Sequence, residues 1–353
     1  MQPTITVAPK KRNHFISYIK GYAIICVVLI HMIDWSNIVL TATGRWWKEL
    51  LYPGVFFFIF TSGSVVYIAY NHYDTWKKPA LKLIKRGAQI IGIYFLYSII
   101  KLYIFDFTFE PYFWQYTQTG KMNLHNILTL QATSVPIGIL VTIGALVMLS
   151  PILLAITKKI KFSNIFLSGL LVIIVYLAYF TNFSGPISNF LFSRNTIMFP
   201  LALWSIPFII GYLVASLGFE NKKLLWAGMF IPLAILYFLY LRQSGQSIIP
   251  SEYMYPLRAY YIIVSLAFMA VLFYIFYWLE KIKFKIIKYF LSLMRFLGDY
   301  TLSIYIWHWV AVDMTLWLFF PHYKMIFLTV SIVLALIVLL KKNKFLQYIE
   351  NQV

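Results

Sequence analysis

The chain consists of long apolar stretches separated by short polar or charged segments. Each stretch has about the twenty residues that a helix needs to cross the hydrocarbon core of a bilayer. The pattern therefore predicts an all-α, polytopic membrane protein with ten spanning helices. These are expected at residues 15–35, 51–71, 87–105, 134–157, 163–181, 197–218, 224–241, 257–279, 298–320 and 323–340.

Lysine and arginine are distributed unevenly among the connecting segments. If the N-terminus is cytoplasmic, the cytoplasmic segments carry twenty of the 30 Lys and Arg residues, and the segments on the other side carry seven. The richest cytoplasmic segments are 77–86 and 281–288. Cytoplasmic loops of membrane proteins are enriched in this way. We therefore predict that both termini are cytoplasmic.

Composition supports the membrane interpretation and excludes several function classes. Of the 353 residues, 61% are hydrophobic and 12% are charged, whereas about a quarter of the residues of soluble domains are charged. The net charge of +19 follows from the topology, so no nucleic-acid partner is expected. The single cysteine, Cys26, excludes a disulfide framework and a cysteine-based metal site. No metal is expected, and residues 1–353 are interpreted as a single membrane-embedded domain.

The first predicted span contains three ionisable residues. Lys20 and His31 are eleven residues apart, close to three helical turns, so they share a face with about 16 Å between them along the axis. Asp34 follows His31 by three residues and can orient or pair with the imidazole. Ionisable residues within spans often mark function. The structural alternative is that Lys20 extends to the membrane surface and His31 makes an interhelical hydrogen bond.

The second and third spans add weaker signals. Ser62 and Gly63, after Gly54 and a phenylalanine-rich segment, favour close helix packing and only secondarily a site. Arg86, the last of a group with Lys82 and Lys85, is typical of a charge that sets topology. The same group suits a polyphosphate.

A late span carries a third polar group. Tyr305 and His308 are three residues apart and share a helix face, and Ser303 lies nearby. A histidine with hydroxyl neighbours in a span is either a proton relay or a packed polar contact. The sequence alone leaves both interpretations open.

These segments together resemble the acyltransferase-3 family of integral membrane acyltransferases. Residues 17–31 resemble its first helix, which has a basic residue eleven positions before an essential histidine. Residues 54–63 match its second-helix pattern of Gly-Val and Ser-Gly. Arg86 with Tyr94 resembles its basic cytoplasmic loop and third helix, and residues 297–308 match its late segment ending in Trp-His.

Four positions depart from the family pattern. Lys20 stands where the family has arginine, and Ser17 stands where it usually has aspartate. Phe56 replaces an acidic residue, and Gln89 replaces the second arginine of a cytoplasmic pair. All four lie on or near the expected donor path, so they bear on donor binding more than on the fold.

The resemblance implies a multi-pass enzyme of the bacterial cytoplasmic membrane that transfers an acyl group across the bilayer. The expected donor is acetyl-CoA, used as a substrate with no bound cofactor, and the expected acceptor is a hydroxyl of a sugar or cell-envelope polysaccharide. His31, with Asp34 beside it, is expected to act as the general base, which needs only one chemical step, and a transient acyl carrier is the alternative role. Expected donor-binding residues are Lys20, Lys82, Lys85 and Arg86. Further motif residues are Gly54, Ser62, Gly63, Ser303, Tyr305 and His308.

Two other functions remain as alternatives. A transporter or flippase for a glycan or lipid-linked sugar also fits buried charges and ten helices, but it predicts pseudo-symmetric halves with broken helices in corresponding places, and the sequence shows no such internal repeat. A catalytically silent relative that acts as an assembly partner is the third interpretation. Its only support is the four departures.

Overall fold

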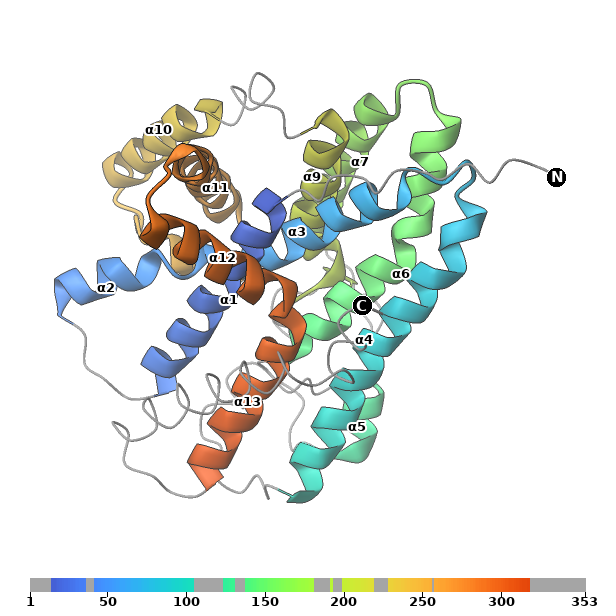
Figure 1. Cartoon of the computed structure of the whole chain (residues 1–353), viewed down its shortest axis with the longest axis horizontal. Helices are drawn as coiled ribbons and strands as arrows, with labels where there is room; N and C mark the ends of the chain where they lie inside the picture. Colours follow the sequence, from blue (N-terminus) through green and yellow to red (C-terminus); the bar gives the residue numbers. More distant parts are fainter. Residues whose placement is uncertain are drawn as a thin grey trace.

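The computed structural model describes residues 14–35, 41–104, 123–130, 137–180, 191–192, 199–218, 228–255 and 257–317 (Figure 1). Within these ranges the regular structure is helical and contains no strand, which confirms the all-α prediction. The helices are α1 (His14–Trp35), α2 (Ala42–Glu49), α3 (Pro53–Tyr70), α4 (Lys77–Ile104), α5 (Leu124–Leu128), α6 (Gly138–Lys159), α7 (Ser163–Phe180), α9 (Leu201–Leu217), α10 (Phe230–Gln243), the 3-10 helix η4 (Pro250–Tyr253), α11 (Ala259–Lys281), α12 (Lys285–Asp299) and α13 (Thr301–Trp317).

Nine predicted spans correspond to helices of this structure. Five stretches are long and apolar enough to cross a membrane, namely His14–Asp34, Thr43–Tyr70, Lys77–Tyr103, Gly138–Lys159 and Ala259–Lys281. Four shorter apolar helices lie in α7, α9, α10 and α13. The tenth predicted span, 323–340, lies outside the described residues. Helices α2 and α12 fall in segments that the sequence pattern assigned to loops.

Contacts between helix ends support an alternating path of the chain. Lys158 Nζ, at the end of α6, donates to the carbonyl oxygen of Asn71, just after α3, at 2.6 Å. The start of α1 meets the end of α11, where the rings of Tyr18 and Phe276 are 5.2 Å apart. We call this end, with the lysines that begin α4 and end α6 and α11, the basic end. The ends of α3 and α6 thus lie together, and the start of α1 lies beside the end of α11.

The opposite end joins α2, η4, and the starts of α3, α6, α9 and α11. Ser251 Oγ in η4 donates to Glu49 Oε1 in α2 at 2.7 Å. Thr142 Oγ1 in α6 donates to the carbonyl oxygen of Phe199, which precedes α9, at 2.7 Å. These contacts connect separate elements through polar groups, so hydrogen bonds between side chains and backbone hold this end together.

Helices α3 and α9 approach so closely that their backbones touch. A Cβ on Gly63 would collide with the carbonyl of Phe208, and one on Gly211 would collide with the carbonyl of Phe60. Ser64 Oγ also donates to the carbonyl oxygen of Gly211 at 2.9 Å. Small residues and hydroxyl hydrogen bonds are the usual means of helix association where lipid removes the hydrophobic drive.

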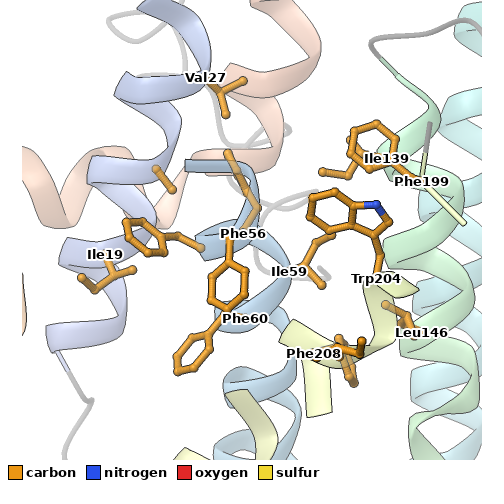
Figure 2. Close-up of a cluster of buried hydrophobic side chains, with 14 of the residues drawn as sticks. Ile19, Val27, Phe56, Ile59, Phe60, Ile139, Leu146, Phe199, Trp204 and Phe208 are labelled. Atoms are coloured by element: carbon orange, nitrogen blue, oxygen red, sulfur yellow. The ribbon is translucent and has the colours of Figure 1, made fainter. Parts of the chain in front are cut away.

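An apolar cluster fills the space between α1, α3, α6 and α9 (Figure 2). It includes Phe56 and Trp204, both fully buried. Figure 2 shows Phe56 between α1 and the aromatic residues of α9. Position 56, where the family carries an acid, is thus part of the apolar core, where an unpaired carboxylate would be expensive.

The apolar stretch Thr43–Tyr70 is broken between α2 and α3. Pro53 has no N–H, so the helical ladder cannot continue through it. The hydroxyl of Tyr22 donates to the carbonyl oxygen of Leu50 at 3.0 Å, and that of Tyr261 donates to the carbonyl oxygen of Tyr52 at 2.7 Å. Irregular backbone at membrane depth needs such partners. Tyrosines of α1 and α11 therefore stabilise the break.

Candidate functional site

Two histidines from opposite ends of the chain meet between α1 and α13. His31 Nδ1 lies 3.0 Å from His308 Nε2. His308 is fully buried and His31 is half-buried. The two rings are parallel, with centroids 5.3 Å apart. The residues are far apart in sequence, so only the packing of α13 on α1 creates the pair.

The contacts of His308 indicate which ring nitrogens carry a proton when both histidines are neutral. His308 Nδ1 lies 3.3 Å from the carbonyl oxygen of Ile304, and a carbonyl can only accept, so this nitrogen is the protonated one. His308 Nε2 then accepts a hydrogen bond from the Nδ1–H of His31. His31 Nε2 is left with its lone pair available. In this arrangement His308 fixes the orientation of the His31 ring through the contact at Nδ1.

Aromatic rings enclose the pair. The ring of Trp309 is 4.2 Å from that of His31, and the ring of Tyr305 is 5.3 Å from that of His308. Phe58 of α3 packs against Tyr305 at 6.0 Å. These rings surround the buried His308, while His31 stays partly accessible.

The structure places Asp34 in a different contact from the one expected. Its carboxylate forms an ion pair with Lys48 of α2, and His308 occupies the hydrogen-bonding position at His31 Nδ1. Residues three apart on a helix differ by about 60° around its axis and about 4.5 Å along it. Asp34 therefore reaches Lys48 of α2, whereas His31 meets His308 of α13. Asp34 thus ties α1 to α2, one turn beyond His31.

A charged cluster at this end was missed by the sequence analysis. Glu49 Oε2 accepts from the backbone N–H of Ser251 at 2.9 Å, in addition to the bond from its hydroxyl. Lys48 lies over the ring of Tyr52 at 5.5 Å, besides its ion pair with Asp34. The sequence does contain a signal for this cluster, namely the adjacent Lys48 and Glu49 shortly before Pro53. An acid and a base beside a helix break in an apolar region are unusual.

The motif residues of α3 serve mainly in packing. A Cβ on Gly54 would meet Cys26 and the backbone of α1. Ser62 Oγ donates to the carbonyl oxygen of Phe58 in its own helix at 2.8 Å, and Gly63 forms the contact with α9. Ser303 of α13 is buried, and it lies five residues before His308 in the sequence.

Lys20 lies on α1 beside α12. A Cβ on Gly21 would collide with the backbone of Met294, and one on Gly298 would collide with that of Ser17. Ser17 Oγ donates to Asp299 Oδ1 at 3.0 Å. A carboxylate from α12 is thus present at the position where the family carries aspartate on α1.

The remaining basic residues lie at the start of α4. Lys82 and Lys85 are exposed and Arg86 is half-buried. Lys82 Nζ donates to the hydroxyl of Tyr73 at 3.1 Å. Gln89 is exposed one turn further along. These side chains lie at the basic end, on a different helix from Lys20.

Among the described residues no group of three or more His, Cys, Asp or Glu is placed to hold a metal ion. The site therefore consists of an imidazole pair, an acid–base cluster beyond it, and basic residues at the other end.

The described residues define a helical membrane protein in which two histidines from different helices are in contact. The chain matches the acyltransferase domain of the acyltransferase-3 family over residues 13–340 and belongs to that family. The match covers nearly the whole chain and confirms the resemblance of the four segments. No curated protein and no solved structure matches the chain significantly.

Proposed function

We propose that this acyltransferase moves an acetyl group from cytoplasmic acetyl-CoA to a hydroxyl of an extracytoplasmic sugar, such as one of a cell-envelope polysaccharide, in the bacterial cytoplasmic membrane. The observation that carries the proposal is the contact between His31 and His308, in a chain of an acyltransferase family. The pair lies about 16 Å along α1 from Lys20. An extended pantetheine arm is suited to that distance.

The proposed reaction needs one base and no bound cofactor. His31 Nε2 takes the proton from the acceptor hydroxyl while the oxygen attacks the thioester carbonyl. The new C–O ester bond forms, the C–S bond breaks, and the CoA thiolate leaves and takes up the proton. His308 accepts from His31 Nδ1–H throughout, so that the imidazolium is stabilised where it forms.

The donor is proposed to bind at the basic end. Lys82, Lys85 and Arg86 suit the CoA phosphates, and Arg86 alone among them offers a bidentate fork. Lys20 lies deeper along α1 and provides a point charge for a phosphate or a pantetheine carbonyl. The thioester is already an activated donor, so ATP is unnecessary.

The acceptor is proposed to bind at the opposite end. Lys48 and Glu49 present groups that can hydrogen-bond sugar hydroxyls. Trp46 and Trp47 of α2 are exposed there and offer flat apolar faces to a pyranose ring. The acceptor hydroxyl would then approach His31 from the side of Asp34.

The decisive experiment compares envelope glycans and acetyl-CoA turnover with and without the chain. Wild-type protein in nanodiscs should produce an O-acetylated glycan detectable by mass spectrometry. His31→Ala should remove transfer, by about 10²–10⁴-fold, while the protein still inserts. The matched control is His72→Ala, at an exposed histidine after α3, which should leave transfer unchanged. Unaltered transfer in His31→Ala would exclude the proposed base.

Orientation is tested by cysteine labelling in a Cys26→Ala background. Cysteines at His125 and Gln246, both exposed, should react with a membrane-impermeant reagent added to intact cells. Cysteines at Lys78 and Lys283, exposed at the basic end, should react only after lysis. Reaction at Lys78 in intact cells would reverse the donor path.

One observation favours the transporter alternative, namely the break between α2 and α3. Broken helices line substrate sites in many transporters. Export of an unmodified glycan that survives His31→Ala, without acetyl-CoA consumption, would support that function over acyl transfer.

A further inference from the structure

Helix α12 has one side that faces the protein. Leu291, Met294, Leu297 and Gly298 are buried, and their spacing of three and four residues places them on one arc of the helix. This arc packs on α1 at Ser17 and Gly21 through the glycine contacts described above. In Figure 1, α12 crosses over α1 and does not run alongside it. The buried arc accounts for less than half of the helix surface.

A second arc of α12 is apolar and exposed. Ile286 and Tyr289 are 77% and 73% exposed, and Phe290 and Leu293 are also exposed. These four residues follow the helical spacing of a single face next to the buried arc. A contiguous exposed apolar face in water would be a liability. Beside a bilayer, the same face is what an interfacial helix inserts among acyl chains.

The third arc is polar and cationic. Lys285, Lys288, Ser292 and Arg295 are all exposed, and their spacing places them together on the remaining face. The only acid of the helix is Asp299, whose Oδ1 accepts from Ser17 of α1. The three cations therefore form a stripe that borders the apolar arc along the helix.

The end of α11 indicates the depth at which α12 begins. Lys281 Nζ lies 3.9 Å from the ring centroid of Tyr277 and 4.6 Å from that of Trp278. Trp278 is 61% exposed. Tryptophan, tyrosine and lysine gather at the membrane–water boundary of spanning helices. Because α12 starts four residues after Lys281, it begins at headgroup level.

We propose that α12 lies in the bilayer surface at the basic end and binds anionic phospholipid headgroups. Its apolar arc (Ile286, Tyr289, Phe290 and Leu293) enters the acyl region, and its cationic stripe (Lys285, Lys288 and Arg295) binds the lipid phosphates. Anionic lipid is the fitting partner because each lysine or arginine near such a surface contributes about 1 kcal/mol, or roughly fivefold in binding. The bound lipid then holds α12 against the part of α1 that carries Lys20.

The depth of the helix is tested with spin labels in a Cys26→Ala background. Tyr289→Cys in the apolar arc should be accessible to oxygen and protected from a water-soluble nickel reagent in nanodiscs. Ser292→Cys, three residues away in the cationic arc, should show the reverse. Equal access of the nickel reagent to both labels would overturn the interfacial placement.

Lipid selectivity is tested on full-length protein reconstituted with equal amounts of phosphatidylglycerol and phosphatidylcholine. Mass spectrometry of the lipids that remain after purification should show phosphatidylglycerol enriched. A Lys285→Gln/Lys288→Gln/Arg295→Gln variant should lose about tenfold or more of that enrichment. A Lys285→Arg/Lys288→Arg variant keeps the charge and should retain it.

A matched control neutralises three other exposed lysines of the basic end, at Lys77, Lys78 and Lys159. This variant should keep most of the enrichment, and an equal loss would show a general charge effect and overturn the assignment to α12. Saturating acetyl-CoA should leave the enrichment unchanged. Displacement of lipid by acetyl-CoA would make the stripe part of the donor site and likewise overturn the proposal. Neither readout requires transfer activity, so the proposed function is tested separately.

Discussion

The two halves of α1 use opposite means to meet their neighbours. Near its start, Ser17 and Gly21 face α12, and the two backbones touch at Gly21 and Gly298. Near its end, His31 and Asp34 extend polar side chains to α13 and α2. The first half packs on α12 through small residues, and this contact has no room for an additional atom. The second half is joined by groups that can exchange protons and charge.

This difference separates what holds the helix from what the helix does. Close backbone packing is the main source of helix association in a bilayer, and it needs no ionisable group. A polar contact in the same surroundings adds only modest stability, but ionisable groups within spans often serve function. Substitutions at the small residues that join the first half to α12 should therefore change stability, and those at the histidine pair of the second half should change rate.

The largest effect is expected at His308. His308→Leu removes the acceptor for His31 Nδ1–H and frees the imidazole to rotate or change tautomer. We expect the transfer rate to fall by about a hundredfold, less than for loss of the base itself. The double variant with His31→Ala should be no slower than His31→Ala alone, because the two residues act as a unit. Additive losses in single-turnover kinetics would separate their roles.

A similar effect on donor binding is expected at Lys20. Lys20→Met keeps the length of the side chain and removes its charge, so it loses a charge-assisted hydrogen bond of about 1.5–3 kcal/mol. Affinity for acetyl-CoA should fall about ten- to a hundredfold, measured by calorimetry in nanodiscs. Lys20→Arg restores the family residue and should bind as well or better. Equal affinity in Lys20→Met would mean that the charge only reaches the membrane surface.

A smaller effect, on stability alone, is expected at Gly298. Gly298→Ala forces a methyl group against the carbonyl of Ser17 and should lower stability by about 1–3 kcal/mol. The matched control is Gly92→Ala in α4, where no atom lies within 4 Å of the added methyl. That control should be neutral or slightly stabilising, by up to about 1 kcal/mol. Thermal unfolding followed by size-exclusion chromatography compares them, and similar curves would show that α1 and α12 do not touch.

The smallest effect is expected at Asp34. Asp34→Asn breaks the ion pair with Lys48, whose partners are partly exposed, so the loss should be about 0–1 kcal/mol. Transfer should slow by no more than about fivefold. A loss as large as that of His308→Leu would restore Asp34 as the residue that orients His31. Steady-state rates of the two variants at saturating donor decide between them.

Apolar runs along the sequence were sufficient to predict the helical fold. These runs marked nine of the helices, because bilayer thickness fixes the length of an apolar span. The largest error in a bound is at α4, which begins at Lys77, ten residues before the predicted start. Helix α12 was missed because its apolar residues are divided between a buried and an exposed arc, and lysines interrupt them. Helix α2 was missed because it is short and carries four ionisable or polar side chains near a helix break.

The sequence by itself determined the family and the class of chemistry, and it singled out His31 and His308 as candidate site residues. It did not determine that these two residues meet. A motif records spacing along one helix, which fixes the face on which Lys20, His31 and Asp34 lie but not the helix that covers it. Only the packing of α13 and α2 against α1 decided that His308, and not Asp34, is the partner of His31. Contacts between helices depend on the assembled core, where close approach at residues such as Gly298 sets the position of each helix.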